Sequence, residues 1–96
     1  MKKEKAKALI NQALNRSIDH LAGARDKSLP TYLDSQVARF LDKLKEMEAS
    51  LNSQPFKAQP SKVMTTAIAD GWPFESELGK LICVAESAYG SLESNP

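Results

Sequence analysis

Hydrophobic positions along this chain recur at the three- and four-residue spacing of amphipathic helices. The first such stretch covers residues 4–22, and Gly23 is a suitable residue to end a helix there. One broad face of this stretch consists of Ala6, Leu9, Ile10, Ala13, Leu14, Ser17, Leu21 and Ala24. The pattern therefore predicts a first long helix that buries this face.

A second stretch with the same spacing follows Pro30 and continues to Leu51. Thr31 is a suitable N-cap, and Asp34, three residues later, completes the pattern of a capping box. The apolar stripe of this stretch consists of Leu33, Val37, Phe40, Leu41, Leu44, Met47 and Leu51. Acidic and basic side chains alternate on the opposite face, as they do on solvated helix surfaces. These features predict a second long helix.

The last part of the chain predicts a short helix, a corner and a longer helix. Residues 52–60 are polar and contain two prolines, so we expect a loop, after which Ser61 caps a short helix ending at Gly71. The fourth helix is expected to begin at Pro73 and to continue to about Leu92. The side chains expected inside are Val63, Met64, Ala67 and Ile68, followed by Leu78, Leu81, Ile82, Ala85 and Tyr89.

Together these elements predict an all-α protein, a compact antiparallel bundle of four helices of which the third is short. No segment alternates with the two-residue period of a strand. The chain has 96 residues, of which 42% are hydrophobic, and this suits one packed core. We therefore expect a single helical domain over residues 1–96.

The sequence also predicts the compartment. No apolar run is long enough to cross a membrane, and the lysine-rich start is not followed by the apolar segment of a signal peptide. Cys83 is the only cysteine, so an internal disulfide cannot form. We expect a cytoplasmic protein without a membrane partner.

Residue types that carry chemistry are scarce. The chain has one histidine, His20, and Cys83, whereas metal sites need several converging ligands. His20 lies at the edge of the first helix's apolar face, where its ring tip is expected to reach water, and nothing beside Cys83 would lower its pKa. The glycines stand singly, so there is no phosphate-binding loop. We expect no catalytic residue, metal, cofactor or small-molecule substrate, and a role in binding another macromolecule.

Charge is distributed unevenly along the chain. From Val63 onward there is one lysine against five acids, a net charge of −4, although the whole chain carries +1. Such an acidic part suits a basic protein partner. The N-terminal lysines 2, 3, 5 and 7 could contact nucleic acid. That partner is less favoured, because the other bases alternate with acids and no stacking platform stands out.

Two features of the last part point to a protein interface. The corner Trp72-Pro73-Phe74 places two aromatic rings among acidic residues, as in an interface hot spot. We expect Phe74, one turn before Leu78, to plug the bundle, whereas Trp72 suits either the core or an interface.

The second feature is a stripe of small side chains on the fourth helix, which another backbone could approach closely. That backbone could belong to a neighbouring helix, to a second copy in a homodimer or to a partner, and the sequence leaves the three open. The stripe consists of Ser76, Gly79, Cys83, Ser87 and Gly90.

The same residues resemble a known family, the small helical immunity proteins that protect bacteria against type VI secretion effectors that degrade NAD. In the first helix, the resemblance lies in Ile10-Asn11-Gln12-Ala13-Leu14 and Asp19-His20-Leu21-Ala22. Near the other end it lies in Ala69, Pro73, Glu77-Leu78, Leu81-Ile82 and Ala85. The resemblance covers about residues 8–89.

The resemblance implies a stoichiometric inhibitor that occludes the substrate cleft of a cognate toxin. Because the last part of the chain is acidic, we expect charge to steer the encounter. The residues expected to face the toxin are Asp70, Trp72, Glu75 and Glu77, with Glu86 as an outlying contact.

Overall fold

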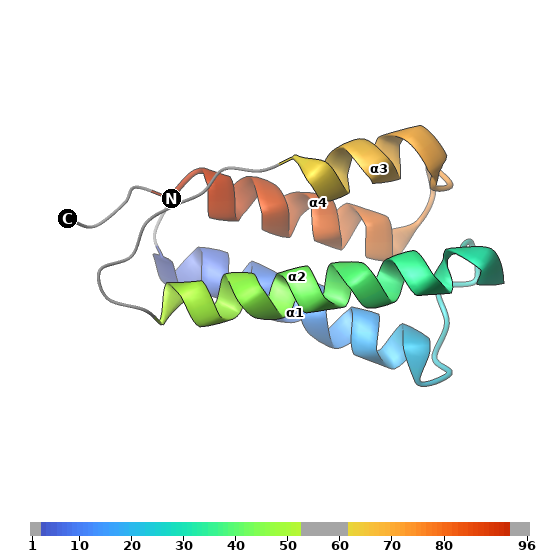
Figure 1. The fold of residues 1–96 in the computed structure, drawn as a ribbon, viewed down its shortest axis with the longest axis horizontal. Helices are drawn as coiled ribbons and strands as arrows, with labels where there is room; N and C mark the ends of the chain where they lie inside the picture. The colour runs from blue at the N-terminus through green and yellow to red at the C-terminus, as the bar shows by residue number, and fades with distance from the viewer. Residues whose placement is uncertain (1–2, 53–61, 93–96) are drawn as a thin grey trace.

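The computed structural model describes residues 3–52 and 62–92. Within these ranges the chain forms α1 (Lys3–Leu21), α2 (Asp34–Leu51), α3 (Val63–Gly71) and α4 (Glu77–Gly90), with a 3-10 turn η1 (Thr31–Leu33) before α2. Successive helices run in opposite directions (Figure 1). The helix α1 packs against both α2 and α4, and α3 packs against α4. The predicted all-α bundle with a short third helix is confirmed.

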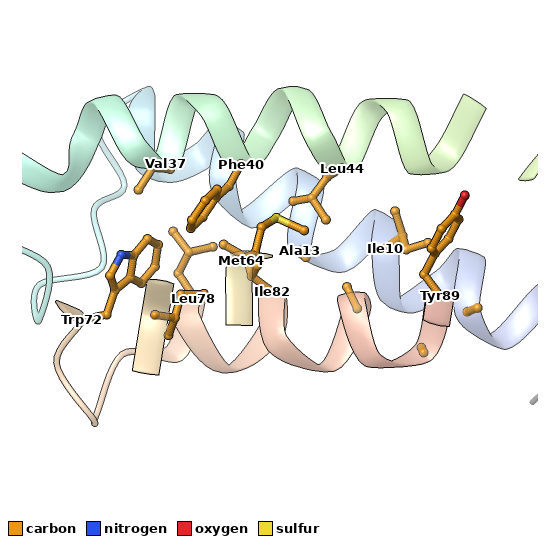
Figure 2. Packing of buried hydrophobic residues seen from close by; sticks show 14 of the residues in the cluster. Ile10, Ala13, Val37, Phe40, Leu44, Met64, Trp72, Leu78, Ile82 and Tyr89 are labelled. Atoms are coloured by element: carbon orange, nitrogen blue, oxygen red, sulfur yellow. The ribbon is translucent and has the colours of Figure 1, made fainter. Parts of the chain in front are cut away.

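All four helices contribute to one hydrophobic cluster, which Figure 2 shows from close by. Ile10, Leu44 and Ile82 are completely shielded from solvent. At one end of the cluster the rings of Phe40 and Trp72 stack with their centroids 5.7 Å apart. The α2 stripe therefore meets the chain at the end of α3 as well as α1.

The end of α1 is a Schellman motif built on Gly23. This glycine has a φ of 124°, which other residues rarely adopt. Its N–H donates to the carbonyl of His20 at 3.3 Å, and the N–H of Ala24 donates to the carbonyl of Asp19 at 2.9 Å. Gly23 thus ends the helix as predicted. Leu21, expected on the buried face, is 39% exposed, because the neighbouring His20 takes the inward position in the last turn of α1.

The predicted capping box at the start of α2 is wrong. Thr31 begins the η1 turn, and no side-chain cap bond forms at either η1 or α2. The Asp34 carboxylate instead accepts two hydrogen bonds from the Arg25 guanidinium, at 2.7 and 3.0 Å. A bidentate pair with a guanidinium is stronger than a bond from a backbone N–H, so it takes the carboxylate.

The helix α4 begins four residues later than predicted. Trp72 has extended backbone angles, and the N–H of Ser76 donates to the carbonyl of Pro73 at 3.1 Å, which closes a turn. Ser76 is the N-cap, and its Oγ accepts from the N–H of Gly79 at 3.0 Å. Pro73 therefore belongs to the turn before the helix.

Two further expectations concern the connection to α3 and the membrane. Apart from Asn52, the predicted loop at 52–60 and the Ser61 cap lie outside the described residues. In the part of the chain that is described, none of the helices combines the length and the apolar character that crossing a membrane requires.

Candidate functional site

The corner between α3 and α4 carries most of the residues that the sequence marks as candidates for binding. Asp70, Glu75 and Glu77 are all exposed. Phe74, which was expected inside, is 94% exposed. That expectation is wrong because the chain is extended at Trp72, so the helical phase that aligned Phe74 with Leu78 is lost. We call Asp70, Phe74, Glu75 and Glu77 the acidic corner.

Trp72 holds this corner to the bundle rather than lining its outer surface. It is 7% exposed and stacks on Phe40. Its indole N–H donates to the Oε1 atom of Gln36 on α2 at 2.6 Å. Both the ring and its polar atom are therefore engaged inside the molecule, and Trp72 is placed in the core rather than among the residues available to a partner (Figure 2).

Glu86 is also placed inside, although the sequence marked it as an outlying contact. It is 3% exposed. Its Oε2 accepts from the N–H of Met64 at 3.1 Å, and its Oε1 accepts from the N–H and the Oγ1 of Thr65 at 2.8 and 2.7 Å. Glu86 thus caps the start of α3, where the backbone N–H groups would otherwise lack partners.

Beneath the acidic corner, Asp26 of the α1–α2 connection caps the start of α4. Its Oδ2 accepts from the Oγ of Ser76 at 2.8 Å and from the N–H of Leu78 at 3.1 Å. Its Oδ1 accepts from the N–H and the Oγ of Ser28 at 3.1 and 2.6 Å. Burial opposes ionisation of Asp26, but the hydrogen bonds outweigh it and lower its pKa to about 2.

His20 connects this cap to α2. The expectation that its ring tip reaches water is wrong, because the side chain is completely buried. The N–H of Asp26 donates to its Nδ1 at 2.8 Å, and its Nε2 lies 3.1 Å from Oδ1 of Asp34. The hydrogen bond from Arg25, followed by the one from His20, lowers the pKa of Asp34 to about 2. The sequence does not predict this cluster of His20, Asp26 and Asp34, because irregular intervals separate the three residues.

The small side chains of α4 line the floor of two shallow grooves beside α3. One groove, of about 370 Å³, passes Gly79 and Cys83 and has Phe74 and Val84 on its rim. The other, of about 650 Å³, passes Cys83, Ser87 and Gly90.

Part of this stripe is explained inside the molecule. A Cβ on Gly79 would come within 3.2 Å of Ile68 and Trp72, so Gly79 allows α3 to approach α4. Of the three backbones that the sequence left open, the neighbouring helix accounts for the first half of the stripe.

Cys83 and His20 do not form a reactive pair. Burial and the charge of Glu86 raise the pKa of the Cys83 thiol, and a hydrogen bond with Thr65 opposes the shift only in part. Both ring nitrogens of His20 are engaged by Asp26 and Asp34. Among the described residues there is also no group of three His, Cys, Asp or Glu side chains that could hold a metal ion.

At the other end of the bundle, the described N-terminal lysines share a surface with an acid. Lys3, Glu4 and Lys7 line a shallow depression together with Leu51 and Asn52. The Nζ of Lys7 donates to Oδ1 of Asn52 at 3.3 Å. This surface is mixed in charge, and none of the described residues that line it is aromatic.

Comparison with known proteins identifies no relative: no family model, no curated protein and no solved structure matches this chain. The resemblance to immunity proteins therefore stays a prediction. The acidic corner is the candidate site because it combines an exposed aromatic ring, exposed acids and a rigid support.

Proposed function

We propose that this protein binds a basic surface of a partner protein through the acidic corner. One observation carries the proposal: the Phe74 ring is 94% exposed in a turn flanked by exposed acids. Burying a phenylalanine ring in an interface is worth about 2 kcal/mol, which an exposed ring leaves unused. Aromatic residues are enriched in interfaces, where a buried anchor is usually surrounded by a polar rim.

The support beneath the corner favours tight binding. Trp72 is held by Phe40 and Gln36, and Ser76 and Leu78 are held by Asp26. A surface that is already ordered loses less conformational entropy when it binds. The acidic corner therefore suits a partner that it meets without rearrangement.

The resemblance to immunity proteins indicates which partner this is. In our proposal the protein is a bacterial, cytoplasmic immunity protein that neutralises a cognate toxin of the type VI secretion class, with NAD degradation as the activity that the family implies. It would act without chemistry, by covering the substrate cleft of the toxin. Such an interface would bury about 1,600 Å² and hold with nanomolar or tighter affinity.

The experiment is co-purification of the tagged protein from its native bacterium, followed by affinity measurement on the captured partner. Reversing two charges, in the variant Glu75→Lys/Glu77→Lys, should weaken binding at least about a hundredfold, since like charges then face each other across the interface. Phe74→Ala should weaken it about tenfold or more.

The matched control reverses two exposed acids of α2, in the variant Asp42→Lys/Glu46→Lys, and should leave the affinity within about twofold. Circular dichroism must show equal folding in all variants, because Glu77 also favours the first turn of α4. Unchanged affinity in both the Glu75/Glu77 and the Phe74 variants would overturn the proposal. Recovery of nucleic acid alone would favour a protein that binds nucleic acid through its N-terminal lysines. Recovery of further copies of the chain alone would favour a self-associating bundle.

A further inference from the structure

His20 is a buried titratable group that takes no part in the acidic corner. It lies in the last turn of α1 with none of its surface exposed. Both of its ring nitrogens have hydrogen-bond partners, the backbone of Asp26 and the side chain of Asp34. Such complete engagement of an imidazole restricts its protonation state.

The partners determine where the ring proton lies. A backbone N–H can only donate, so the Nδ1 atom that accepts from Asp26 carries no proton. The Asp34 carboxylate accepts, so Nε2 carries one. The arrangement therefore requires the neutral ring in its Nε2–H tautomer.

The charged groups that face the ring are few and are already satisfied. From α2, Asp34 contacts Nε2 and is paired with Arg25 of the α1–α2 connection. From the same connection, Asp26 presents its N–H to the ring and its carboxylate to Ser76 and Leu78 of the α4 start. Asp26 thus lies between His20 and the first turn of α4.

We propose that His20 is a proton-sensitive latch on the start of α4. A second ring proton, on Nδ1, would oppose the N–H of Asp26 with another donor at a separation of 2.8 Å. The imidazolium would keep its bond to Asp34, since a positive ring binds a carboxylate more strongly. The backbone at Asp26 is the part that yields, and its carboxylate then leaves Ser76 and Leu78.

The latch has two states, which differ in the charge of the His20 ring. With the neutral ring the start of α4 is capped by Asp26, and with the imidazolium the cap is released. Glu77 of the acidic corner is the first residue of α4, and Phe74 and Glu75 lie directly before it. The inference does not depend on the proposed function, because it concerns the free protein.

The test is nuclear magnetic resonance on the wild-type protein at about pH 8 and about pH 5. Because the chain has a single histidine, its ring nitrogen signals are unambiguous. At the higher pH we expect an unprotonated Nδ1 and a protonated Nε2. On acidification Nδ1 should gain a proton. The exchange protection of the Asp26 and Leu78 amides should then fall about fivefold to tenfold, the equilibrium value of one hydrogen bond, while amides in the middle of α2 keep theirs.

The variant His20→Asn supplies a control, because its amide oxygen can accept from Asp26 without titrating. Its Asp26 and Leu78 protection should be the same at both pH values. An Nδ1–H tautomer at the higher pH, a ring that stays neutral at the lower pH, or a protonated ring with unchanged Leu78 protection would each overturn the proposal. These wild-type results decide it even if the variant does not fold.

Discussion

At the scale of single residues, Trp72 and Phe74 stand two positions apart and lie in opposite environments. Trp72 is 7% exposed and Phe74 is 94% exposed. The extended backbone at Trp72 and the turn that follows interrupt the helix between them. Consequently, the ring that stabilises the fold and the ring that is available to a partner are different residues.

This difference leads to the first prediction. Trp72→Phe keeps an aromatic ring against Phe40 but loses the bond to Gln36 and part of the buried volume. We expect it to cost about 1–3 kcal/mol of unfolding free energy. The exposed Phe74→Ala variant should stay within about 0.5 kcal/mol of the wild type. Urea unfolding followed by circular dichroism measures both, and equal costs for the two variants would contradict the assignment.

Asp26 leads to a prediction about acid stability. Its folded-state pKa is about 2, below the ordinary 3.8. A lowered carboxylate pKa stabilises the folded protein above the ordinary value, and this contribution is lost as the pH falls from about 4 towards 2. The contribution at neutral pH is about 2 kcal/mol.

The check is urea unfolding at about pH 6 and about pH 2 for the wild type and for Asp26→Asn. The variant should be less stable at the higher pH and should lose less stability on acidification than the wild type. The Arg25–Asp34 pair lowers the pKa of Asp34. It therefore also contributes stability that is lost on acidification, and it does so in both proteins. If acidification lowered the unfolding free energy of the two proteins equally, the role of Asp26 would be contradicted.

At the scale of elements, both helices of the C-terminal part begin on carboxylates from distant segments. Glu86 of α4 caps α3, and Asp26 of the α1–α2 connection caps α4 together with Ser76. Each cap joins two elements as well as satisfying backbone N–H groups. The positions of α3 and α4 are therefore defined by polar contacts at their ends as well as by apolar packing.

The cap on α3 gives a further prediction. Glu86→Ala leaves the Met64 and Thr65 N–H groups without their acceptor and should cost about 2 kcal/mol. Glu86→Gln keeps one acceptor oxygen for the two groups and should cost about 1 kcal/mol. The exposed neighbour variant Ser87→Ala is the control and should stay near the wild type in thermal or urea unfolding. A Gln variant as stable as the wild type would show that the charge and the second oxygen are dispensable.

These elements also show how far the sequence could be interpreted. The stripes of α1 and α2 predicted the helices and most of the core, because side chains that share a helix face are three or four residues apart. Gly23 was predicted because a Schellman motif is local. The roles of Asp26, His20 and Glu86 were missed, since their partners lie on other segments and depend on how the helices pack. The environment of Phe74 was missed because helical phase cannot be carried across a turn.

At the scale of the whole molecule, one hydrophobic cluster joins all four helices. The single tryptophan reports the end of α3 and its contact with α2, whereas far-ultraviolet circular dichroism reports all helices together. We therefore predict that thermal unfolding followed by tryptophan fluorescence and by circular dichroism gives coincident transitions, as in a two-state domain. A fluorescence transition at lower temperature would show that the α3–α4 corner separates from the bundle first.

The Glu86 cap also concerns the order of events during synthesis. The helix α3 has nine residues, fewer than the dozen or so at which an isolated helix becomes marginally stable. The carboxylate that completes its first turn is 21–22 residues further along the chain. A ribosome needs roughly one to four seconds to add that many residues. During that interval the segment of α3 lacks the residue that caps its first turn. We therefore expect α3 and α4 to form together, against α1 and α2.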